Sequence, residues 1–265
     1  MTALSDALAK ARADSRSALI GYLPVGYPSV ELSIEAMQAM VAGGADVIEV
    51  GVPYSDPVMD GPTIQAAAEP AVRAGVNIDD ALLAVAAVAR AGAAAVIMSY
   101  WNPIERYGVD RFAQQLADAG GAGAITPDLI PDEAQAWLAA TDERGLDRVF
   151  LVAPSSSDDR ITATTAASRG FVYAASTMGV TGTRAAVDGG ARALVTRVRN
   201  LAPDIAVCVG LGVSTGDQAA EVAQFADGVI VGSAFVRQLL NAPDARGVAG
   251  VGALARELAA GVRAR

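Results

Sequence analysis

Histidine is absent from this chain, and lysine and cysteine occur once each, as Lys10 and Cys208. Without histidine there is no Ser-His-Asp triad, no histidine general base and little basis for a zinc site. Lys10 lies in an N-terminal stretch typical of an amphipathic helix, so no lysine is available at a strand end to form a Schiff base. Cys208 lies in an apolar run, which makes thiol catalysis a poor explanation. An acid/base enzyme built from this chain must therefore use Asp, Glu or Tyr.

Basic stretches and long apolar runs are also missing. The net charge is −9, so nucleic acid and anionic membranes are poor partners. No run is long enough to cross a bilayer, and the N-terminus lacks the apolar core of a signal peptide. A lone cysteine excludes an intramolecular disulfide and fits a reducing compartment, so we expect a cytoplasmic protein. With 265 residues, 52% of them hydrophobic, the chain fits one domain spanning residues 1–265.

Short apolar runs alternate with alanine-rich, helix-like segments along the whole chain. The runs cover residues 18–23, 47–50, 95–99, 122–126, 149–152, 171–174, 205–209 and 228–231. They are continuous rather than alternating, as in a parallel sheet that is buried on both faces. Eight such units predict an α/β fold, a (β/α)8 TIM barrel with an extra N-terminal helix. A doubly wound open sheet is the alternative, but no G-x-G-x-x-G motif follows the first run.

Two acids near the second run are the strongest candidates for chemistry. Glu49 lies at the end of this buried run, where an ionised carboxylate without a partner is costly. Asp60 follows on a Gly- and Pro-rich loop and precedes Gly-Pro-Thr, which opens a helical pattern. In a barrel, both acids would lie at the C-terminal mouth, where active sites are built. The pair therefore indicates acid/base chemistry.

Each acid also has a purely structural interpretation. Glu49 could form a buried ion pair with one of the many arginines. Asp60 could be a turn or N-cap residue. Asp56 and Asp128 stand next to prolines and fit loop geometry better than catalysis. Tyr173, within the sixth run, could belong to the core, with its hydroxyl group in need of a partner.

Glycines follow the last three runs and suggest a phosphate site. Gly182 lies after the sixth run, Gly210 and Gly212 after the seventh, and Gly232 with Ser233 after the eighth, where a helix opens. In many barrels these loops and a helix N-terminus bind phosphate through backbone N–H groups. Each glycine alone could be a turn or a helix C-cap. The connections 51–62 and 176–190 are long enough to act as lids.

Together these motifs resemble the tryptophan synthase alpha chain family, with likeness to its actinobacterial members. The matching segments are 21–24, 26–28, 49–57, 60–65, 99–103, 127–131, 153–156, 170–173, 179–182, 209–214 and 232–234. The resemblance implies a lyase that cleaves indole-3-glycerol phosphate to indole and glyceraldehyde 3-phosphate by a retro-aldol route. It implies that Glu49 is the general acid/base and that Asp60 accepts the indole N–H.

The resemblance also assigns the remaining contacts of the site. It implies phosphate binding by Gly182, Gly210, Gly212, Gly232 and Ser233. It implies packing against the indole ring by Tyr22, Ile64, Met98, Tyr100, Ile125, Tyr173 and Leu211. Thr181 corresponds to a lid residue that meets Asp60 on closure. The departures are Tyr22 and Leu211, where many members have Phe, and Met59, where many have Ala; they affect the shape of the pocket.

The family works in a complex, an alpha2-beta2 heterotetramer in which indole passes to a beta chain. In this chain the loop with Pro53, Asp56 and Pro57, together with segment 100–107, matches the docking side. No cofactor is expected in this chain, because pyridoxal phosphate belongs to the beta chain and Lys10 is badly placed to hold it.

Three alternatives stay open. Other phosphate-binding barrels use strand-end aspartates or lysines that this chain lacks. A stand-alone lyase that releases free indole would share Glu49 and Asp60. A non-catalytic subunit that only activates a partner would have no need of both acids.

Overall fold

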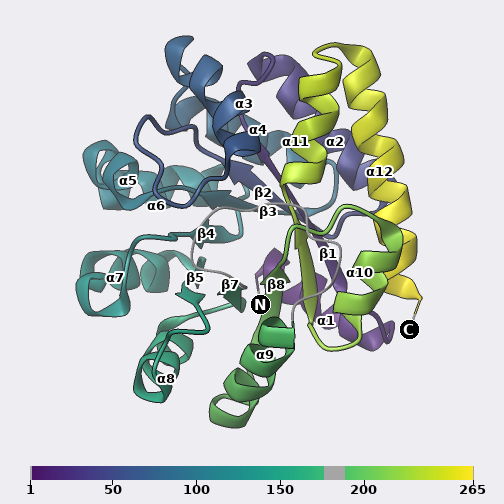
Figure 1. The fold of residues 1–265 in the computed structure, drawn as a ribbon. Helices are drawn as coiled ribbons and strands as arrows, with labels where there is room; N and C mark the ends of the chain where they lie inside the picture. Colours follow the sequence, from purple (N-terminus) through teal and green to yellow (C-terminus); the bar gives the residue numbers. More distant parts are fainter. Residues whose placement is uncertain (1, 176–188, 265) are drawn as a thin grey trace.

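Parallel strands stand at the centre of the molecule and helices surround them (Figure 1). The structure, a computed structural model, describes residues 2–175 and 189–264. Nine strands are present in these ranges, in the order β5-β4-β3-β2-β1-β9-β8-β7-β6, and all pairings are parallel. The strands are β1 (Ala18–Pro24), β2 (Val47–Gly51), β3 (Ala94–Met98), β4 (Gly123–Ile125), β5 (Asp147–Val149), β6 (Leu151–Val152), β7 (Phe171–Ala175), β8 (Ala206–Gly210) and β9 (Gly228–Val231).

The sheet closes on itself at Phe150. β5 pairs with β4, whereas β6, which begins one residue after Phe150, pairs with β7. The Tyr173 N–H donates to the Phe150 carbonyl across this junction, at 3.0 Å. The fifth predicted run is thus one strand whose two halves face different neighbours. The closed parallel sheet confirms the predicted TIM barrel.

Helices cover the outside of the barrel. They are α1 (Ala3–Ala13), α2 (Val30–Gly43), α3 (Pro62–Arg73), α4 (Ile78–Arg90), α5 (Trp101–Tyr107), α6 (Val109–Asp118), α7 (Gln135–Arg144), α8 (Asp158–Ala167), α9 (Gly189–Leu201), α10 (Gly216–Ala223), α11 (Ser233–Asn241) and α12 (Ala245–Arg263). Side-chain caps fix several starts, as at Ser29, Ser157 and Thr215. The sequence did not predict α5 or α12. A 3-10 turn, Pro131–Glu133, precedes α7.

Alternate residues of each strand face two different apolar layers. One layer fills the barrel interior, with Ile20, Val47, Val96, Phe171 and Cys208 among its members. The other lies between the strands and the helices and is much larger. Both faces of the sheet are therefore dry, which explains the continuous apolar runs in the sequence.

Helix α1 closes the N-terminal end of the barrel. Leu4, Leu8 and Ala11 are buried against the interior layer. At the helix start, the Thr2 hydroxyl group donates to the carboxylate of Asp147, the first residue of β5. The C-terminal strand ends are consequently the end of the barrel where a site can form. No helix within the described ranges is long and apolar enough to span a membrane.

Replacement of Leu4 by alanine should lower the free energy of unfolding by about 2–4 kcal/mol, because it leaves a cavity at the closed end of the barrel. Leu83→Ala on α4 is the matched control, since Leu83 is 60% exposed and Leu4 is 0% exposed. It should change stability by less than about 0.5 kcal/mol. Urea unfolding of both variants provides the comparison. Equal losses would contradict the role of α1 as a closing element.

Candidate active site

Glu49 points into the barrel from the middle of β2. It lies in register with Tyr22 on β1 and Val96 on β3. The residue is 1% exposed, and its Oε1 atom has no hydrogen-bond partner among the described residues. Burial raises the pKa of Glu49 to about 8. No arginine of the described ranges forms an ion pair with Glu49.

Asp60 lies at the end of the loop that joins β2 to α3. The Tyr100 hydroxyl group donates to Asp60 Oδ1 at 3.2 Å and accepts from the Met59 N–H at 2.9 Å. Helix α3 has Gly61 at its N-cap position, so Asp60 does not cap this helix. Burial raises the pKa of Asp60, and the hydrogen bond from Tyr100 opposes the rise. The Tyr100 hydroxyl group therefore orients the Asp60 carboxylate.

Two further tyrosines lie near the acids. Tyr22 is in register with Glu49, and burial together with the charges of Asp60 and Glu49 raises the pKa of its phenol. The pKa of Tyr173 is raised by burial and then by Glu49. Tyr22 and Tyr173 therefore both lie near Glu49.

Two glycines make room for these rings. A Cβ atom on Gly51 would lie 2.6 Å from the Tyr22 hydroxyl group, and one on Gly210 would lie 2.4 Å from that of Tyr173. Any larger residue would push the tyrosines away from their positions. The sequence assigned Gly210 to phosphate binding and gave Gly51 no role. Their contacts with rings could not be found without the strand register.

Apolar side chains surround the acids at the C-terminal strand ends. Met98 on β3 is in register with Gly51 on one side and with Ile125 on the other. Ile64 in the first turn of α3 is 5% exposed, and Ile125 is fully buried. Leu211 follows β8 directly and packs against the core. The predicted indole contacts are thus brought to one end of the barrel.

The predicted phosphate residues lie on neighbouring strand ends. Gly210 ends β8, and Gly232 occupies the N-cap position of α11, whose first residue is Ser233. No side chain caps this helix, and Gly212 has a φ of 69°, a left-handed conformation that favours glycine. Thr181 and Gly182 lie outside the described residues.

The other acids have structural roles. Asp128 Oδ1 accepts from the Trp101 N–H at 2.9 Å and so caps α5 from a neighbouring loop. Asp56 is exposed and accepts from the Ser55 hydroxyl group at 2.6 Å. Both observations agree with the loop interpretation. Lys10 pairs with Asp14 on α1, at the closed end of the barrel.

Comparison with known proteins yields one family. A family model described as the tryptophan synthase alpha chain matches residues 8–262. The alpha chain of Thermobifida fusca is 61% identical over 267 residues, which cover 100% of this chain and 99% of that protein. A solved structure of Mycobacterium tuberculosis tryptophan synthase has a TM-score of 0.93 and 60% identity, covering 99% of this chain and 98% of that one. The chain belongs to the tryptophan synthase alpha chain family.

The resemblance seen in the motifs is therefore confirmed, including the likeness to actinobacterial members. The family consists of lyases that cleave indole-3-glycerol phosphate in tryptophan biosynthesis. Of the two acids chosen from the sequence, Glu49 lies inside the barrel in the middle of β2, and Asp60 lies on the loop that follows this strand. Sequence reasoning missed the hydrogen bond between Tyr100 and Asp60, because it treated Tyr100 only as an apolar contact.

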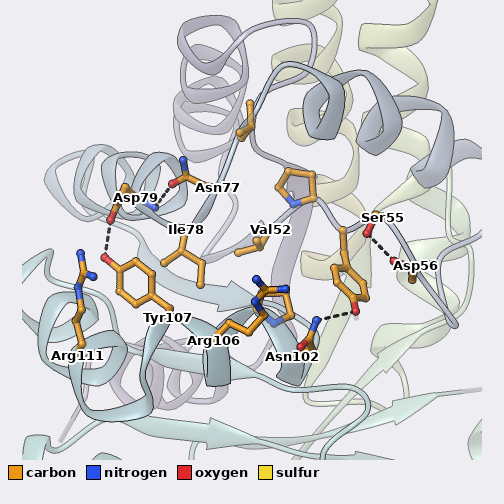
Figure 2. Close-up of a pocket in the computed structure, with 14 residues that line it drawn as sticks. Val52, Ser55, Asp56, Asn77, Ile78, Asp79, Asn102, Arg106, Tyr107 and Arg111 are labelled. Carbon is orange, nitrogen blue, oxygen red and sulfur yellow. Dashed lines mark hydrogen bonds between the residues drawn. The ribbon is translucent and has the colours of Figure 1, made fainter.

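A groove of about 630 Å³ lies outside the barrel, beside the loop that carries Asp60 (Figure 2). The loop after β2, the start of α4 and helix α5 form its walls. Figure 2 shows the Tyr107 hydroxyl group donating to Asp79. The Asn102 amide donates to the Tyr54 hydroxyl group. The groove includes Pro53 and Asp56 and part of segment 100–107, which the resemblance assigned to the docking side.

Burial of Glu49 should make stability depend on pH. Between its ordinary pKa of 4.5 and its folded value of about 8, the folded chain keeps a proton that the unfolded chain has released. The free energy of unfolding should therefore fall as pH rises, by up to about 1.4 kcal/mol per unit from this group.

Glu49→Gln removes this titrating group. The free energy of unfolding of the variant, relative to that of wild type, should therefore increase from about pH 5 to pH 8. Urea unfolding across this interval measures the difference. Glu35→Gln, on the exposed face of α2, is the control and should parallel wild type. A Glu49→Gln curve parallel to wild type would show that the carboxyl group is not kept protonated.

Proposed function

We propose that this chain cleaves indole-3-glycerol phosphate with Glu49 as the proton carrier and Asp60 as the partner of the indole nitrogen. The observation that supports this most strongly is the contrast between the two carboxyl groups. Glu49 is buried without a hydrogen bond to Oε1 and has a pKa of about 8. Burial raises the pKa of Asp60 as well, but Asp60 receives a hydrogen bond from Tyr100, which opposes the rise and favours its charged form.

The first step is protonation of the indole ring. The bond from indole C3 to the glycerol carbon cannot break until C3 is tetrahedral. Glu49, neutral near pH 7, transfers its proton to C3 and becomes a carboxylate. Positive charge then develops on the ring nitrogen, where the Asp60 carboxylate accepts the N–H and stabilises it.

The second step breaks the carbon–carbon bond. The Glu49 carboxylate removes the proton from the hydroxyl group on the adjacent glycerol carbon. The electron pair of that O–H bond forms the aldehyde C=O, and the pair of the C–C bond returns to the indole ring. Indole and glyceraldehyde 3-phosphate result, and Glu49 has regained its proton. One carboxyl group thus serves both steps, which a pKa close to neutrality favours.

The phosphate group is proposed to bind at the N-terminus of α11. Gly232 and Ser233 present this helix end at the mouth of the barrel, and no side chain caps it. The helix dipole and backbone N–H groups favour an anion there without a lysine. Gly210 and Gly212 allow close approach on the neighbouring strand end. Gly182 and the lid residue Thr181 are proposed to complete the site.

The proposal includes a partner chain and a compartment. The solved Mycobacterium tuberculosis relative is a tryptophan synthase. We propose that a beta chain docks on the groove beside Pro53, Asp56, Pro57 and segment 100–107, giving an alpha2-beta2 heterotetramer. The partner would hold pyridoxal phosphate, because Lys10 lies at the closed end of the barrel. A cytoplasmic location is proposed, in keeping with a single, buried thiol.

Release of indole from indole-3-glycerol phosphate tests this function directly. The purified chain should release indole slowly, and addition of a tryptophan synthase beta chain should raise the rate sharply. Fast release by the chain alone would instead indicate a stand-alone lyase. No release under either condition would overturn the proposed reaction.

Glu49→Gln tests the proton carrier. Turnover should fall by roughly 10²-fold or more, the scale expected for loss of an acid/base group. Glu35→Gln is again the matched control and should retain wild-type turnover, because it lies outside the barrel. Circular dichroism would establish that both variants are folded. Near-normal cleavage by Glu49→Gln would exclude the role given to this residue.

A further inference from the structure

Tyr54 connects the groove with the interior of the site. It lies on the loop between β2 and α3, and its ring centroid is 5.2 Å from that of Tyr100, with the planes tilted by 34°. Its hydroxyl group accepts from the Asn102 amide at 3.0 Å. Asn102 is exposed on α5 and faces the groove (Figure 2). One end of Tyr54 therefore contacts the groove and its ring contacts a buried residue.

Tyr100 continues the path toward the catalytic end of the barrel. It is 5% exposed, and its hydroxyl group lies between the Met59 N–H and the Asp60 carboxylate. Met59 and Asp60 both lie on the loop that joins β2 to α3, so the strand register does not fix their contacts with Tyr100. Its ring orientation is set in part by the packing of Tyr54 against it. Because hydrogen bonds weaken steeply with distance and angle, a small rotation of this ring would weaken its bond to Asp60.

We propose that Tyr54 is a positioning residue that couples the Asn102 end of the groove to the Asp60 carboxylate. A partner segment that binds at Asn102 shifts the Tyr54–Tyr100 ring pair, and with it the hydroxyl group that holds Asp60. The proposal rests on the function proposed above. It adds a route, made of two hydrogen bonds and one ring contact, by which partner binding alters the reaction.

The charged and titratable groups around Asp60 determine how a change in the Tyr54–Tyr100 contact alters the pKa of Asp60. Tyr100 faces it from the start of α5, Tyr22 faces it from β1, and Glu49 lies deeper on β2. Of these, Tyr100 donates to the carboxylate and thereby opposes the rise that burial causes in the pKa of Asp60. Loss of that bond should raise the pKa. The acid limb of kcat/KM, which requires ionised Asp60, should then move to higher pH.

Two kinds of variant separate the ring from the hydroxyl group. Tyr54→Leu and Tyr54→Met remove the ring, so the acid limb should move up by roughly 1 pH unit. Most of the loss of kcat/KM in these two variants should appear as a lower kcat rather than a higher KM, since Asp60 acts on charge that develops during the reaction. Tyr54→Phe keeps the ring and should leave the acid limb at the wild-type pH. An unshifted limb in both ring-less variants, or an equal shift in Tyr54→Phe, would overturn the proposal.

The groove end of the route is tested with a beta chain at saturating concentration. Tyr54→Phe lacks the hydrogen bond to Asn102, so its stimulation by the beta chain should fall by about threefold or more relative to wild type. Saturation removes any effect of weaker docking. Full stimulation of Tyr54→Phe would overturn this half of the route.

A carboxyl-carbon NMR titration distinguishes failure of the route from failure of the proposed function. The Asp60 signal, identified by its loss in Asp60→Asn, reports its pKa without turnover. If wild type releases no indole, the function is wrong, yet an upward shift in Tyr54→Leu would still support the contact route. If wild type is active and the Asp60 pKa is the same in Tyr54→Leu, the route alone is wrong.

Discussion

Closure of the parallel sheet is the constraint on which the rest of the structure depends. The sheet closes because β5 pairs with β4 and β6 pairs with β7, and apolar layers cover both of its faces, so the barrel interior is dry. Helix α1 fills the N-terminal end of this interior. Polar chemistry is then confined to the opposite end, where Glu49 is held by its neighbours on β1 and β3. The loss of solvent around Glu49, rather than any specific bond, gives this acid its raised pKa.

The two carboxyl groups illustrate how position within one fold separates their chemistry. Glu49 belongs to a strand, so its surroundings are rigid and apolar. Asp60 belongs to a loop, so its hydrogen bond comes from Tyr100, which precedes α5. A neutral acid and an oriented carboxylate on the same substrate are what ring protonation and charge stabilisation need. The barrel supplies the first by burial and the second by a loop contact.

The loop after β2 has a second consequence, because it borders both the site and the outer groove. Tyr54 and Asp56 line the groove, whereas Asp60, a few residues later, contacts Tyr100 at the mouth of the barrel. A partner that contacts the first part of this loop cannot leave the second part unaffected if the rings of Tyr54 and Tyr100 stay in contact. In the route proposed above, a partner acts on Asp60 without a large movement of the barrel itself.

The sequence by itself determined the parallel barrel, the N-terminal helix and the choice of Glu49 and Asp60. Continuous apolar runs report burial on both faces, and an acid at the end of such a run has few structural explanations. Only the tertiary structure decided that Phe150 divides strand five between two neighbours, that Gly51 accommodates Tyr22, and that Tyr100 holds Asp60. These contacts join residues roughly 20–40 positions apart in the chain. Periodicity identifies each element but carries no information about the strand register that places Gly51 beside Tyr22, or about the loop path that brings Asp60 to Tyr100.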